Sequence, residues 1–92
     1  MDFDAEIEDA NRELRILRLA KFLVKAYYKN GSMSVMLNDG RRLDDRPTYV
    51  DDTYAFSRNV HNKAMEMARL SITSPRRPFN VKETYEPRAS RQ

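Results

Sequence analysis

The feature that most constrains this chain is a run of 27 residues, positions 3–29, that contains neither glycine nor proline. The run is rich in Glu, Arg, Leu, Lys and Ala, and over a window of this length their helix propensities become informative. Acidic residues crowd its first turns and basic residues its later ones, an order that complements the helix macrodipole. The run therefore predicts one long helix that ends at Asn30-Gly31, where glycine can adopt the left-handed cap conformation.

The apolar residues of this helix change face partway along. Toward the N-terminus they recur at spacings of four and three, the seam that a helix offers to a single partner helix. This apolar stripe consists of Phe3, Ile7, Ala10, Leu14 and Leu17. From Ile16 onward the apolar residues cover more than half of the circumference, so this part needs cover from two directions. What is left there is a basic ridge of Arg15, Arg18, Lys21, Lys25 and Lys29.

A β-hairpin is predicted after the helix. Residues 32–37 nearly alternate in polarity, and residues 41–43 follow across the loop Asn38-Asp39-Gly40. Gly40 suits the left-handed bulge position that closes such a three-residue loop. Because two strands this short are marginal alone, the hairpin must lie against a helix or pair with another strand. Residues 48–50 are the candidate for a short third strand.

A second helix is predicted over about residues 53–72. Asp51 or Asp52 is a natural N-cap, because a carboxylate there accepts hydrogen bonds from free backbone N–H groups. One broad apolar face comprises Phe56, Val60, Ala64, Met67, Ala68 and Leu70, with Tyr54, Met65 and Ile72 along its edge. The fold class expected is α+β and mainly helical: a long N-terminal helix, a small β-hairpin, a second helix and an extended C-terminal arm.

The chain divides into one small domain, residues 1–74, and a Pro- and Arg-containing arm, residues 75–92. No regular element fits the arm. Apolar side chains at Phe79, Val81 and Tyr85 suit an extended segment that docks onto a protein. The arm also offers possible phosphate contacts through Arg76, Arg77, Arg88 and Arg91. A single core of this size is thinly stabilised, so self-association is an open expectation.

Residues that could carry chemistry are few. The chain has no cysteine, which excludes disulfides and Cys-based zinc sites and is typical of a reducing compartment. The acids Asp44, Asp45, Asp51 and Asp52 lack the spacing of a calcium loop and are interpreted as turn and cap residues. His61, the single histidine, is interpreted as a residue at the boundary of the apolar face. The sequence therefore predicts no catalytic, metal or cofactor site and no small-molecule substrate.

The N-terminus is acidic where a signal peptide would be basic, and the apolar runs are short, so neither a secretion signal nor a membrane contact is expected and the location expected is cytoplasmic. The function expected is non-enzymatic protein–protein interaction, as an assembly subunit, adaptor or inhibitor of a larger complex. This composition is typical of phage and other viral accessory or structural proteins. The partner would be a second copy or another protein. The alternative is a nucleic-acid-binding regulator that uses the basic arm and the basic ridge.

Overall fold

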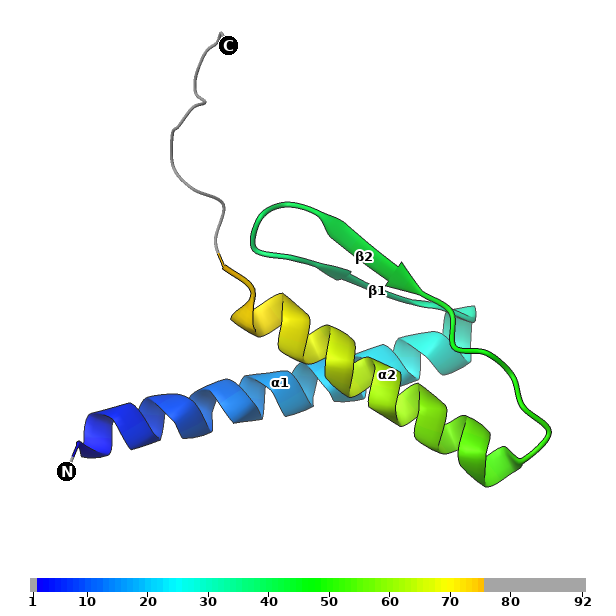
Figure 1. The fold of residues 1–92 in the computed structure, drawn as a ribbon, viewed down its shortest axis with the longest axis horizontal. Coiled ribbons are helices and arrows are strands. Elements are labelled where there is room, and N and C mark those ends of the chain that lie inside the picture. The colour runs from blue at the N-terminus through cyan, green and yellow to red at the C-terminus, as the bar shows by residue number, and fades with distance from the viewer. Residues whose placement is uncertain (1, 76–92) are drawn as a thin grey trace, which may run out of the picture.

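The structure, a computed structural model, describes residues 2–75, which form two helices and one two-stranded antiparallel hairpin (Figure 1). The elements in chain order are α1 (Phe3–Asn30), β1 (Met33–Met36), β2 (Arg42–Asp45) and α2 (Thr53–Thr73). The predicted mainly helical α+β class is confirmed over this range. Both predicted helices begin where the sequence placed them, and each extends one residue beyond its predicted end.

The ends of α1 follow from local chemistry. The carboxylate of Asp2 accepts hydrogen bonds from the backbone N–H groups of Asp4, at 3.1 Å, and Ala5, at 3.3 Å. These bonds satisfy donors that have no partner within the helix. At the other end Gly31 has φ +85° and donates its backbone N–H to the carbonyl oxygen of Tyr27 at 2.6 Å. The predicted left-handed cap at Gly31 is confirmed.

The start of α2 and the hairpin loop also follow the predicted chemistry. Asp52, rather than Asp51, is the N-cap of α2, and its carboxylate accepts from the backbone N–H groups of Tyr54 and Ala55. In the loop Gly40 has φ +92°, and its N–H donates to the carbonyl oxygen of Leu37 at 3.0 Å. Both glycines of the chain therefore have positive φ, where a side chain would be strained.

The hairpin pairs Met33 with Asp45 and Met36 with Arg42. The predicted third strand is wrong, because residues 48–50 form no strand. Pro47 has no N–H to donate to a sheet, and its carbonyl oxygen accepts from the Tyr27 hydroxyl at 3.4 Å. The ring of Tyr49 lies 5.7 Å from that of Phe56 on α2, so this segment follows the helices instead.

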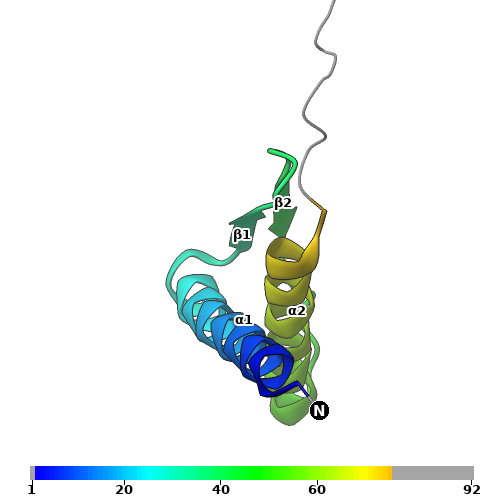
Figure 2. The same ribbon diagram turned by 90° about the vertical axis from the view of Figure 1, so that its left-hand side faces the viewer.

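The core lies where α2 crosses the later part of α1 beneath the hairpin (Figures 1 and 2). The two helices and β1 all contribute to it, which confirms that this part of α1 is covered from two directions. The buried side chains are Ile16, Ala20, Leu23, Met33, Val35, Val60, Ala64, Met67 and Ala68. Leu70, predicted on the core face, is 45% exposed, because at about 100° per residue it lies past the edge of the face that Val60, Ala64 and Met67 form.

Candidate protein interface

Most of the apolar stripe lies on the part of α1 that no other described element covers. In Figure 1 the N-terminal segment of α1, residues 3–14, projects past the end of α2, and every residue from 2 to 15 is exposed. The large stripe side chains are 43% to 67% exposed: Phe3, Ile7, Leu14 and Leu17. The structure thus places the four predicted residues on one exposed face, and of the four Leu17 also borders the groove beside α2.

This segment gains little stability from the rest of the chain. An isolated helix of about 12 residues is marginal in water, because nucleation is costly and packing normally supplies most of the stability. Burying one large apolar side chain is worth roughly 1.5–3 kcal/mol. Contiguous exposed apolar side chains on a small protein are typical of an interaction surface. The stripe therefore has both the composition and the unmet packing of an interface.

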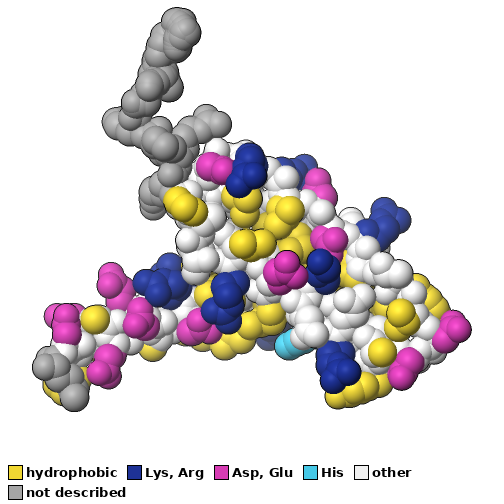
Figure 3. All heavy atoms as spheres, viewed as in Figure 1, with side chains coloured by type: hydrophobic (Ala, Val, Ile, Leu, Met, Phe, Trp, Pro, Cys, Tyr) yellow, Lys and Arg dark blue, Asp and Glu magenta, His cyan; other side chains and the backbone are white. Residues whose placement is uncertain are grey.

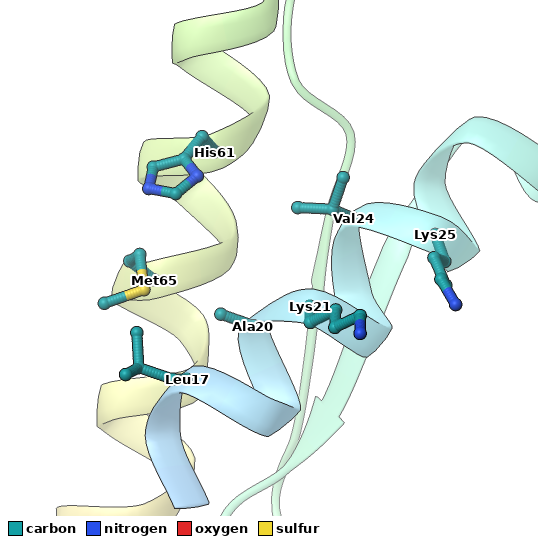
Figure 4. A pocket seen from close by; sticks show the side chains of 7 residues that line it. All are labelled: Leu17, Ala20, Lys21, Val24, Lys25, His61 and Met65. Atoms are coloured by element: carbon teal, nitrogen blue, oxygen red, sulfur yellow. The ribbon is translucent and has the colours of Figure 1, made fainter. Parts of the chain in front are cut away.

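At Leu17 the stripe opens into a groove between the two helices (Figure 4). Its volume is about 420 Å³. Leu17, Ala20 and Val24 of α1 form one wall and His61 and Met65 of α2 the other, as the close view shows. Two lysines of the basic ridge, Lys21 and Lys25, complete the lining from the outer edge of α1.

Sequence reasoning missed this groove, although a signal for its α1 wall exists. Lys21 and Val24 follow Leu17 at the same spacings of four and three that define the stripe. The lysine conceals the continuation, since an apolar pattern is expected to end at a charged residue. The α2 wall has no comparable signal, because only the crossing of the helices brings His61 and Met65 to this side. His61 is exposed and lies at the edge of the α2 core face.

Charge is strongly polarised along α1. Acidic side chains gather on the N-terminal end in Figure 3, while the five residues of the basic ridge are all exposed farther along. The ion pairs that α1 makes with residues 2–75 are Arg12–Asp9 at 3.1 Å and Glu13–Arg69 at 2.8 Å. Within that same range, Arg18, Lys21 and Lys25 have no ion-pair partner. Cations and anions on this helix are thus available to an external partner.

The Glu13–Arg69 pair marks the boundary between the covered and uncovered parts of α1. Arg69, near the end of α2, donates from both terminal guanidinium nitrogens to the Glu13 carboxylate, at 2.8 and 3.4 Å. These hydrogen bonds, with the positive charges of Arg69 and Arg12, lower the pKa of Glu13 below its ordinary value of 4.5. The same bonds raise the pKa of Arg69.

Two of the acids interpreted as turn and cap residues have other roles. Asp44 and Asp45 lie in β2, so that interpretation is wrong for them. Asp44 accepts from the Ser34 hydroxyl across the hairpin and from Arg42 at 3.1 Å, and the Ser34 bond is the main cause of its lowered pKa. Asp45 lies 4.0 Å from the Lys63 ammonium. Both residues therefore belong to a paired strand and not to the connector that follows it.

The structure brings together no metal-binding group of three His, Asp or Glu side chains within residues 2–75. Neither helix in that range is long and apolar enough to cross a membrane. The predictions for the arm fall outside the described residues. They concern docking through Phe79, Val81 and Tyr85 and phosphate contacts through Arg76, Arg77, Arg88 and Arg91.

Comparison of the chain with protein families, with curated proteins and with solved structures finds no match. The functional argument therefore depends on the geometry of the stripe, the groove and the charges.

Proposed function

We propose that this protein works by protein–protein contact, as an assembly subunit, adaptor or inhibitor of a larger complex, and that it catalyses no reaction. The observation that carries the proposal is the apolar stripe, whose large side chains are left 43% to 67% exposed by the folded chain. Their spacing on one helical face is the pattern by which a helix docks onto a partner helix or groove.

The position of the stripe supports the same conclusion. Most helical stability in proteins comes from packing of an apolar face, yet this helix of 28 residues is packed along only its later part. Singly exposed apolar residues need no explanation, but the large residues of the stripe follow one another along one face. A partner that covers this face would supply the packing that residues 3–14 lack.

A second candidate function is nucleic-acid binding. It is favoured by the basic ridge, whose five residues are all exposed. With the arginines of the arm, the ridge would neutralise backbone phosphates, and binding would then weaken steeply as salt rises. Acidic residues crowd the first turns of the same helix and would repel a phosphate backbone, so protein contact is the better supported function.

The test uses the full chain and two variants of matched exposure. Ile7→Asp with Leu14→Asp places charge on the stripe, while Phe22→Asp changes a side chain that is 63% exposed but belongs to another face. In a monomer such exposed substitutions shift stability by only about 0.5 kcal/mol. We expect the stripe variant to lose assembled mass in light scattering and to melt at lower temperature, and Phe22→Asp to behave as wild type.

If the wild-type protein assembles and the stripe substitutions change neither its mass nor its melting temperature, the proposed function is refuted. The same samples, run with a short DNA duplex and an RNA at low and high salt, test the second candidate. A monomer that binds nucleic acid only at low salt would favour the regulator.

A further inference from the structure

We propose that the partner of the apolar stripe is a second copy of this chain, bound with its α1 antiparallel to the first. The acidic N-terminal segment of each α1 then lies along the basic, groove-bearing segment of the other. This inference rests on the proposed function and specifies its partner. Three observations carry it: the continuation of the stripe spacing, the charge polarity of α1 and the groove beside α2.

The spacing defines one register. Continued through the groove, the positions at intervals of four and three are Phe3, Ile7, Ala10, Leu14, Leu17, Lys21, Val24 and Tyr28. When two such helices run antiparallel about a twofold axis midway between Leu14 and Leu17, Leu14 of each copy faces Leu17 of the other. Ile7 then faces Val24, and Phe3 faces Tyr28. The exposed apolar side chains of the stripe thus find apolar neighbours at every position but one.

That one position joins Lys21 of each copy to Ala10 of the other. A small alanine leaves room for the lysine stem to lie along the seam while its ammonium group reaches water. A lone lysine in a helical seam selects a register at a cost in stability. Shifting the register by one repeat would set Lys21 against Phe3 in one direction and against Leu17 in the other. Either shift leaves large apolar residues at one end of the stripe without a partner, so the central register is preferred.

Charge complementarity decides the direction. In the antiparallel register Asp4 of one copy meets Lys25 of the other on the flank of the seam, and Asn11 meets Arg18. Lys25 and Arg18 have no ion-pair partner among residues 2–75, so both are available for such contacts. A parallel pair would instead bring the acidic first turns of the two copies together and the basic ridges together, which costs free energy through like-charge repulsion.

The groove receives the end of the second helix. Because Ile7 of the second copy faces Val24, its first turns enter the space of about 420 Å³ between α1 and α2. There they also contact His61 and Met65, so the second copy is held by both helices. The two α1 helices overlap over nearly their full length, about 40 Å at 1.5 Å per residue. This arrangement covers the segment that the folded chain leaves bare.

The natural absence of cysteine allows a direct test of direction. The variants Asp4→Cys and Lys25→Cys are prepared separately, one of them isotopically labelled, and then mixed and oxidised. A disulfide requires Cα atoms within about 7 Å. In the antiparallel pair, residue 4 of one copy meets residue 25 of the other, whereas the two copies of residue 4 lie about 30 Å apart. We therefore expect disulfides between the two variants and few within either one.

A matched control uses Glu8→Cys mixed with Phe22→Cys. Both positions are exposed and would meet at nearly the same level of the antiparallel pair, but both lie away from the seam. Their mixture should form disulfides only at the rate of random collision. A crossed yield as high as that of the first mixture would overturn the proposed seam.

Charge reversal supplies an independent readout. Asp4→Lys or Lys25→Asp alone creates two like-charge pairs in the dimer and should weaken association by about tenfold. The variant with both substitutions restores two opposite-charge pairs, so its dissociation constant in sedimentation equilibrium should return close to that of wild type. Additive weakening in the double variant would overturn the register.

The outcomes separate this inference from the proposed function. Disulfides within Asp4→Cys alone would show parallel pairing and overturn the antiparallel inference, while stripe variants that still dissociate the assembly would uphold contact through the stripe. A wild-type chain that stays monomeric at all concentrations would overturn the second copy as partner. An assembly that ignores the stripe variants would overturn both.

Discussion

The N-terminal and later segments of α1 form one continuous helix but differ in what surrounds them. Residues 3–14 are exposed throughout, whereas Ile16, Ala20 and Leu23 are at most 5% exposed beneath α2 and the hairpin. Both segments carry apolar side chains at helical spacing. The difference lies in the width of the apolar face, narrow in the first segment and broad in the second. It teaches that the rest of the fold covers the broad face and leaves the narrow stripe exposed.

The two segments also depend on each other. The later segment provides a formed helix onto which the first can add turns, and propagation costs far less than nucleation. In return the first segment carries the acids that favour the positive end of the helix dipole. We therefore expect the stability lost on substitution and the rate of hydrogen exchange to differ between the residues before Glu13 and those after it.

Shortening a core side chain should have the largest effect on the free energy of unfolding. Leu23 is fully buried, so Leu23→Ala removes packing from both helices and leaves a cavity. We expect a loss of about 2–5 kcal/mol in the free energy of unfolding, measured by urea titration. Ile7→Ala, on the exposed stripe, should cost less than about 0.5 kcal/mol when the protein is dilute. Equal losses from the two variants would refute the contrast between the segments.

This contrast was largely readable from the sequence, because it depends on local properties. Each signal acts within about one turn of the chain. The signals are the width of an apolar face, the capping acids Asp2 and Asp52, and the glycines Gly31 and Gly40. Such signals predicted both helices, the hairpin and the stripe. The exposure of Leu70 was also within reach of the sequence, because its helical angle sets it past the edge of the buried face of α2.

What the sequence could not supply were relations between distant segments. The groove requires the crossing of two helices, and the Glu13–Arg69 pair joins residues that are 56 positions apart. The connector after Pro47 resembled a strand in composition, but the Tyr27 hydroxyl and the Phe56 ring hold it against the helices. Tertiary contacts of this kind override local preference.

Hydrogen exchange should show the next largest difference. Backbone amides near Leu23 open only with the core, whereas those of residues 7–13 open by fraying of an unpacked helix. In dilute protein we expect exchange of residues 7–13 to be roughly a hundredfold faster, or more, than exchange near Leu23. Raising the concentration should slow exchange in residues 7–13 alone, and the double stripe variant serves as the control that does not respond.

The two N-caps provide a smaller test of the same contrast. Asp52 caps the helix that packs along the core, so Asp52→Ala should lower the free energy of unfolding by about 1 kcal/mol. Asp2→Ala removes the equivalent bonds from the uncovered end of α1. It should change helicity by circular dichroism while the global unfolding midpoint stays close to wild type. A larger shift from Asp2→Ala would mean that the first segment unfolds together with the core.

The smallest expected effect concerns pH and the boundary residue Glu13. Hydrogen bonds from Arg69 hold the pKa of Glu13 below 4.5 in the folded chain, so the ion pair stabilises the fold above that pH. The contribution is lost as pH falls from about 5 through the folded pKa, because the carboxyl becomes protonated. In Glu13→Gln this part of the acid dependence should disappear, so the wild-type and variant melting temperatures should converge as pH falls.

Glu8→Gln is the matched control, since it removes the same charge from the same uncovered helix without touching Arg69. Its melting temperature should follow that of wild type through the acid range. Both side chains of the Glu13–Arg69 pair are about half exposed, so solvent and salt screen their attraction and the Glu13→Gln effect should shrink in high salt. A convergence that persists unchanged in high salt would place its cause elsewhere and leave the boundary of the covered segment at Ile16, where burial begins.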